Sequence, residues 1–170
     1  MKTFSIIVKA DTFTTDYPHI IDTPFYISSQ GKVFPDSQWT DFTYPILNDW
    51  AYALLRHRDK NESKFSLHFM DGPFRLDVTK DKDMKLTIQC VNFRKEETTE
   101  LTINCNYVDF LLALYQAIKK TSEIMFNNNI HQGKFESVYK QLNLISKELE
   151  TVIGSYSSTA CRMCYPTSLR

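Results

Sequence analysis

Four short segments of alternating apolar and polar residues, within residues 64–105, constrain the fold of this chain more than any other feature. Successive side chains of a strand point to opposite faces, so slipping any pairing by one residue would turn an apolar row toward water. The pattern therefore predicts an antiparallel β-meander with one apolar face. The expected strands are about 64–70, 74–80, 84–92 and 98–105.

The turns between these segments predict how the strands pair. A turn centred on residues 71–72 sets the first pairing, a three-residue turn at 81–83 the second, and a turn at 95–96 the third. The mixed charges of residues 80–83 fit a solvated turn. The expected opposite pairs are Phe69/Phe74, Leu67/Leu76, Phe65/Val78, Val78/Leu86, Leu76/Ile88, Phe74/Cys90, Cys90/Leu101, Ile88/Ile103 and Leu86/Cys105.

The segments outside the meander predict two more strands and three helices. Alternation predicts strands at residues 4–8 and 25–28, and Gly31 and Pro35 should end any strand beyond the second. Apolar residues then recur at helical spacing in three stretches. The expected helices are about 43–57, capped by Asp41 or Thr43, 107–126, with Asn106 and Asp109 as a capping pair, and 135–153, ended by Gly154.

Together these elements predict a single α+β domain over residues 1–154, followed by a C-terminal tail at 155–170. The last two helices should form an antiparallel hairpin. At 1.5 Å per residue each is roughly 28 Å long, enough to cover the apolar face of the meander from end to end. The Ser- and Thr-rich stretch at 155–159 predicts a tether between the domain and the tail.

Composition narrows the classes of function. The 20 basic and 20 acidic residues cancel, so no net charge draws the chain to nucleic acid or anionic lipid. No apolar run is long enough to span a membrane, and Lys9 and Asp11 interrupt the first one before it reaches signal-peptide length. We therefore expect a cytoplasmic protein with no nucleic-acid or membrane partner. Cys90 and Cys105 would lie roughly 13 Å apart along the sheet, too far for a disulfide.

Signatures of common catalytic sites are missing from the sequence. The four glycines stand apart, which leaves no phosphate-binding loop or dinucleotide fingerprint, and no G-x-S-x-G or H-E-x-x-H motif occurs. We expect no catalytic residue, cofactor or metal. Cys161 and Cys164 have the spacing of a redox pair or half of a zinc site. Because they lie in the last ten residues without a second ligand pair, a chance pair of free thiols is the more common explanation.

The other face of the predicted meander carries polar residues. His68 should lie opposite Arg75, with Asp77 as diagonal neighbour, close enough for a proton-handling cluster. Such a row is more often the solvated side of a one-sided sheet, and where it has a function its mixed donors and acceptors suit protein recognition. Trp39 should either anchor a partner or staple the start of the first helix. The expected partner-binding residues are Trp39, Asp41, His68, Arg75, Asp77 and Gln89.

Two stretches of the chain carry a resemblance. Trp39–Phe42 reads W-T-D-F and leads into a helix with Trp50, and Phe69–Pro73 reads F-M-D-G-P. Together they resemble a group of small uncharacterised bacterial proteins, over about residues 25–78, to which no activity is attached. Some small bacterial α+β proteins of this build resemble immunity proteins of toxin systems, so the resemblance implies such a role by analogy.

Three hypotheses for function remain. The first is a non-catalytic protein-binding module, most concretely an immunity-type protein that occupies a toxin. The second is an enzyme that uses the polar cluster around Asp77 or the C-x-x-C pair of the tail. The third is a homo-oligomer whose helix surface, for example Tyr115 and Tyr139, forms an interface.

Overall fold

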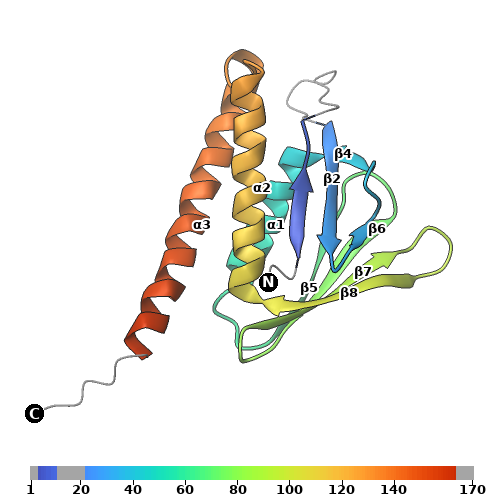
Figure 1. Cartoon of the computed structure of the whole chain (residues 1–170), viewed down its shortest axis with the longest axis vertical. Coiled ribbons are helices and arrows are strands. Elements are labelled where there is room, and N and C mark those ends of the chain that lie inside the picture. The colour runs from blue at the N-terminus through green and yellow to red at the C-terminus, as the bar shows by residue number, and fades with distance from the viewer. Residues whose placement is uncertain (1–3, 11–21, 164–170) are drawn as a thin grey trace, which may run out of the picture.

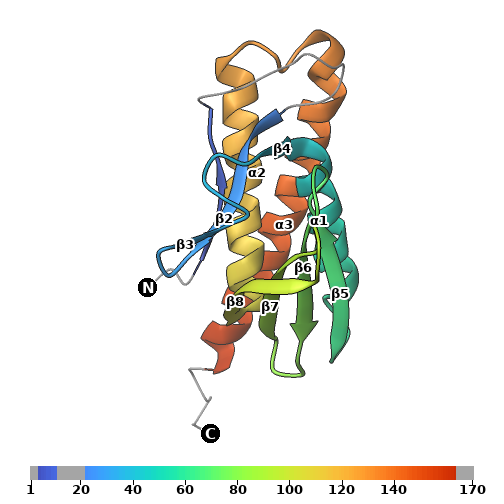
Figure 2. The same cartoon turned by 90° about the vertical axis from the view of Figure 1, so that its right-hand side faces the viewer.

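The computed structural model describes residues 4–10 and 22–163, with side chains described as far as residue 156. These residues form two antiparallel sheets and three long helices, which confirms the predicted α+β fold (Figures 1 and 2). The strands are β1 (Ser5–Val8), β2 (Asp22–Ser29), β3 (Lys32–Phe34), β4 (Thr40–Phe42), β5 (Ser63–His68), β6 (Phe74–Lys80), β7 (Lys85–Asn92) and β8 (Thr98–Asn106). The helices are α1 (Thr43–His57), α2 (Tyr107–Asn127) and α3 (Glu136–Met163), with a short 3-10 turn at Gly133–Phe135.

Strands β5 to β8 pair in chain order, as the alternation predicts. The first predicted register is confirmed, with Leu67 opposite Leu76. The third is confirmed as well, with Ile88 opposite Ile103 and a β-bulge directly after Cys90. All five side chains are buried, so the predicted apolar face is the face that packs inward.

The predicted pairing of β6 with β7 is wrong by two residues, because Val78 lies opposite Ile88. The observed turn spans residues 81–84, and the Asp81 carboxylate accepts hydrogen bonds of 2.9 Å from two backbone N–H groups that follow it. Met84 in this turn has a φ of 61°. Methionine rarely adopts this left-handed conformation, so nothing in the sequence at position 84 indicates that the turn extends beyond residue 83. A shift of two residues keeps every side chain on its predicted face.

The longer turn buries Lys80, which we expected in a solvated turn. Lys80 is 1% exposed and lies opposite Leu86 on the apolar face. Its ammonium group donates hydrogen bonds to the backbone oxygen of Arg58, at 3.1 Å, and to that of Lys60. The ammonium also lies 5.7 Å from the centre of the Tyr107 ring. Lys80 therefore satisfies the carbonyl group of the C-cap residue of α1 and a second carbonyl group in the segment that follows the helix.

The second sheet contains two strands that the sequence analysis missed. The two predicted strands, β1 and β2, pair with each other, and β3 and β4 also pair with β2. Gln30 and Gly31 form the two-residue turn between β2 and β3, with φ values of 52° and 78° that suit a tight hairpin. Gly31 thus starts a hairpin where we expected strand structure to end, and the chain after Pro35 returns to pair with β2.

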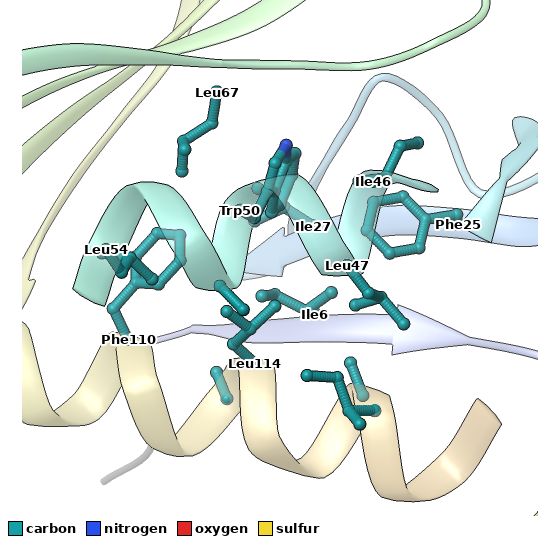
Figure 3. Packing of buried hydrophobic residues seen from close by; sticks show 14 of the residues in the cluster. Ile6, Phe25, Ile27, Ile46, Leu47, Trp50, Leu54, Leu67, Phe110 and Leu114 are labelled. Atoms are coloured by element: carbon teal, nitrogen blue, oxygen red, sulfur yellow. The ribbon is translucent and has the colours of Figure 1, made fainter. Parts of the chain in front are cut away.

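Helix α1 lies between the strands of the meander and the layer formed by β1 and α2 (Figure 3). One side of α1 faces the meander, from which Leu67 points toward it, and the other side faces β1 and α2, with Phe110 and Leu114. Trp50 of α1 is fully buried, and its Nε1–H donates a hydrogen bond of 2.9 Å to the backbone oxygen of His68. The helix therefore connects the meander to the rest of the core.

The apolar face of the meander is covered by α1 and by strands β2 and β3. Phe25 of β2 and Phe34 of β3 each meet Phe69 edge to face, with ring centres 5.8 Å apart. The predicted hairpin of α2 and α3 does form, but α2 packs on β1 and α1, and α3 lies outside α2 (Figures 1 and 2). The expectation that this hairpin covers the meander from end to end is wrong, because the aromatic residues of β2 and β3 need burial too and take part of that surface.

The helix ends agree with the sequence pattern only in part. The carboxylate of Asp109 accepts a hydrogen bond of 3.3 Å from the backbone of the N-cap residue of α2, which confirms the predicted capping pair. Phe42 occupies the N-cap position of α1, and neither predicted residue caps it with its side chain. Helix α3 continues through Gly154 and through 155–159, so its predicted end and the tether are wrong. A glycine inside a helix costs only about 1 kcal/mol relative to alanine, which packing can outweigh.

Candidate interaction site on the meander

The open face of the meander brings four of the predicted site residues together. His68 lies opposite Arg75, and Asp77 lies opposite Gln89. Strand geometry sets this grouping, because these residues alternate with the buried apolar row. His68 and Gln89 are exposed, whereas Arg75 and Asp77 are partly buried.

Arg75 is the centre of a network of ion pairs and hydrogen bonds on this face. Its Nε donates to both carboxylate oxygens of Asp77 at 3.0 Å, and its Nη2 lies 2.7 Å from Oε1 of Glu97. The Ser66 hydroxyl donates a hydrogen bond of 2.6 Å to Asp77. The hydrogen bond from Arg75, supported by that from Ser66, holds the pKa of Asp77 below its usual value.

Two apolar residues beside this network were missed by the sequence analysis. Val91 lies opposite Arg75 and is 2% exposed. Phe93 is 42% exposed, and its ring centre lies 5.5 Å from the Arg75 guanidinium carbon. The available signal was a break in the alternation, since the adjacent Cys90 and Val91 are both apolar, and the β-bulge lies between them. The open face therefore combines an ion-pair network with an exposed aromatic ring.

The surroundings of Asp77 make its carboxylate a poor general base. A general base works best with a pKa near the operating pH, whereas the pKa of Asp77 is lowered and both of its oxygens accept from Arg75. Within the described part of the chain, no hydrogen bond joins the His68 ring to this carboxylate. Arg75 and Asp77 are thus arranged as fixed charged groups.

The other two predicted site residues, Trp39 and Asp41, join the two motifs that carry the resemblance. Asp41, which the sequence places among the expected partner-binding residues, is 1% exposed. Its Oδ1 accepts hydrogen bonds from the backbone N–H groups of Phe42, at 2.7 Å, and Asp71, at 3.0 Å. Its Oδ2 accepts one of 3.2 Å from Nε1 of Trp39. Asp41 therefore ties the W-T-D-F segment to the F-M-D-G-P turn, a contact that we call the motif junction.

The ring of Trp39 packs against the other side of the motif junction. It meets Phe74 edge to face, with ring centres 4.8 Å apart. A Cβ atom on Gly72 would lie 2.6 Å from this ring, and Gly72 has a φ of 80°. The indole is partly buried here, so its observed role is packing at the junction.

Three carboxylates surround the motif junction. Burial raises the pKa of Asp41 to about 6, although the hydrogen bonds it accepts act in the opposite direction. Burial and the negative charge of Asp71 raise the pKa of Asp22. Among the described side chains, those of residues 4–10 and 22–156, no group of three from His, Cys, Asp and Glu is arranged to hold a metal ion. The carboxylate hydrogen bonds at the junction thus serve to hold backbone segments together.

The structure describes the side chains of two of the four cysteines. Cys90 and Cys105 are free, in agreement with the predicted absence of a disulfide, and burial raises the pKa of each thiol to about 12. Such thiols stay protonated at neutral pH and are poor nucleophiles. Cys164 and the side chain of Cys161 lie outside the described residues, so the C-x-x-C interpretation stays a prediction.

Among the described helices, none has both the length and the apolar character that crossing a bilayer requires. The chain matches no protein-family model, and searches of curated proteins and of solved structures return no significant match.

Proposed function

We propose that this protein is a non-catalytic module that binds another protein through the open face of its meander. The observation that supports this most is the Arg75 network with the exposed Phe93 ring beside it. Arginine and large aromatic side chains are enriched among the residues that dominate interface energies. The proposed contact residues are His68, Arg75, Asp77, Gln89 and Phe93.

The arrangement of Arg75 supports binding because its side chain is ordered in the free protein. Asp77 and Glu97 hold its guanidinium, and strands β5 and β7 hold its own strand on both sides. Immobilising a free, flexible side chain on binding costs about 0.5–1.5 kcal/mol. A partner that contacts Arg75 would avoid most of that cost.

The more specific proposal is an immunity-type protein that occupies a bacterial toxin in the cytoplasm. It rests on the analogy with small bacterial α+β proteins. Fixed charges of both signs on one face also support it, because complementary charges speed association and select the correct partner. The partner surface should present an acidic group to Arg75 and an apolar pocket to Phe93.

The test compares tagged variants purified gently from the native host. The variants are Arg75→Ala, which removes the centre of the network, and Gln89→Arg, which adds bulk at an exposed position of the same face. The control is Lys120→Ala, at an exposed position of α2 away from the meander. Thermal unfolding of all variants first establishes that each is folded.

We expect wild type and the Lys120 variant to retain a stoichiometric protein partner, and both meander variants to lose it. An isolated chain recovered from wild-type cells would count against the binding proposal. A partner that stays bound to both meander variants would place the interface elsewhere.

A further inference from the structure

The outward side of α3 carries the most exposed large apolar side chain in the described part of the molecule, Leu144 at 61%. It lies in a shallow groove of about 560 Å³ that follows one stripe of the helix. The stripe repeats at intervals of three and four residues, so its members share one helix face. Its members are Glu136, Tyr139, Lys140, Asn143, Leu144 and Lys147.

We propose that this groove binds the same groove of a second copy of the chain, with the two α3 helices antiparallel. In an antiparallel pair related by a two-fold axis, facing residues have numbers with a constant sum. A sum of 283 places Glu136 opposite Lys147 of the second copy and Tyr139 opposite its Leu144. Both contacts occur twice, because the symmetry repeats them.

Charge complementarity identifies a second copy as the occupant. Glu136 stands at one end of the stripe and Lys147 at the other, about three helical turns apart, so only an antiparallel partner with the same spacing satisfies both ends. Asn143 would face Lys140, which keeps its own ion pair with Glu136 at 2.5 Å. In this register the two contacts between Asn143 and Lys140 lie nearest the two-fold axis. One apolar contact between Tyr139 and Leu144 lies on each side of them, and an ion pair between Glu136 and Lys147 closes each end.

The size of the contact indicates a weak dimer. Three turns of helix against three turns bury less than the roughly 1,200–2,000 Å² of stable interfaces. The helix α3 lies on the side of the molecule away from the meander (Figures 1 and 2). A dimer through α3 would therefore leave the open face of each meander free.

The test is analytical ultracentrifugation of the full chain over concentrations from about 10 µM to about 1 mM. We expect reversible dimerisation by wild type and a dissociation constant raised at least about tenfold by Leu144→Glu. The matched control is Leu112→Glu, the same change at an exposed leucine of α2, which should leave dimerisation unchanged.

Charge exchange tests the antiparallel register. Glu136→Lys and Lys147→Glu should each weaken the homodimer about tenfold, because each places like charges opposite one another. A mixture of these two variants should form a heterodimer with about wild-type affinity, since both facing pairs are then complementary. Differently tagged copies in a pull-down report this directly.

Each remaining outcome overturns the proposal. A wild-type chain that stays monomeric at all concentrations removes the dimer. A dimer insensitive to Leu144→Glu lies elsewhere, and one that responds to this change but shows no preference for the mixed charge variants lacks the proposed register. The meander variants of the binding test leave this measurement unaffected, so the two proposals fail separately.

Discussion

Buried ionisable side chains tie the backbone of this protein together at single residues. Asp41 accepts hydrogen bonds from two backbone N–H groups, and Lys80 donates to two backbone carbonyl groups. A buried backbone group without a partner costs free energy comparable to a lost hydrogen bond. Both side chains therefore serve the fold, although each carries a group that could titrate.

Asp41 should make stability depend on pH. Its pKa rises from 3.8 to about 6 on folding, so between these values the folded state binds more protons than the unfolded chain. The contribution of this group to the free energy of unfolding therefore falls as pH rises from about 4 to about 6. We expect the free energy of unfolding of wild type, measured by urea denaturation relative to that of Asp41→Asn, to fall by about 2–3 kcal/mol as the pH rises from about 4 to about 6. Parallel curves for the two proteins would contradict the raised pKa.

Lys80 should stabilise the end of α1. Replacing it with methionine keeps most of the side-chain volume but leaves the backbone oxygens of Arg58 and Lys60 without their donor. We expect Lys80→Met to lower the free energy of unfolding by about 2–4 kcal/mol. Lys82→Met, in the exposed part of the same turn, should change it by less than about 0.5 kcal/mol. Equal effects of the two substitutions would show that the buried ammonium makes no net contribution.

For single residues, the sequence predicts which face of a sheet a side chain lies on better than it predicts what that side chain contacts. Alternation correctly places Arg75 and Asp77 on the open face of the meander. It cannot predict that Asp41 and Lys80 are buried, because both side chains carry charge and their partners include backbone groups of distant segments. The Phe93 ring was missed because it follows a bulge, where the alternation no longer applies.

Among the elements, the motif junction depends on one close approach, that of the Trp39 ring to Gly72. Gly72→Ala would impose a left-handed conformation on alanine and place its Cβ 2.6 Å from the ring. The conformation alone costs about 1–2 kcal/mol. We expect a loss of unfolding free energy about 1–2 kcal/mol larger than that caused by Gly133→Ala, which has a similar φ and open space around it.

A double-mutant cycle separates the clash from the conformational cost. In a Trp39→Ala background the ring is gone, so the cost of Gly72→Ala should fall toward that of Gly133→Ala, and the remaining difference reflects the Phe74 ring, 3.3 Å from the new Cβ. Equal costs of Gly72→Ala with and without Trp39 would show that the indole moves aside freely.

The elements follow the sequence where a local pattern decides them. Helical spacing correctly predicts the start of all three helices to within a residue or two, and alternation predicts the four strands of the meander. The small strands β3 and β4 have too few residues to show a pattern, and their pairing with β2 depends on contacts between distant segments. The end of α3 was misplaced because a single glycine is a weak stop signal.

In the whole molecule, α1 packs between the meander and the α2–α3 hairpin and contacts both. Leu54 of α1 is fully buried, and the backbone oxygen of the same residue accepts a hydrogen bond of 2.7 Å from the Tyr107 hydroxyl at the start of α2. The Trp50 indole N–H donates a hydrogen bond to the backbone oxygen of His68 in the meander. Loss of packing in α1 should therefore destabilise both the meander and the α2–α3 hairpin, as expected for the single domain predicted over residues 1–154.

Leu54→Ala tests this coupling. We expect it to lower the free energy of unfolding by about 2–5 kcal/mol, the usual cost of removing a buried leucine, whereas Leu112→Ala at an exposed position of α2 should cost less than about 1 kcal/mol. Tryptophan fluorescence reports on the meander side through Trp39 and Trp50, and amide exchange reports on α2 and α3. Because α1 packs against both layers, both signals should shift to lower denaturant together in the Leu54 variant. If the α2–α3 hairpin kept its wild-type exchange while the fluorescence transition moved, the chain would consist of two units, and α1 would belong to the meander alone.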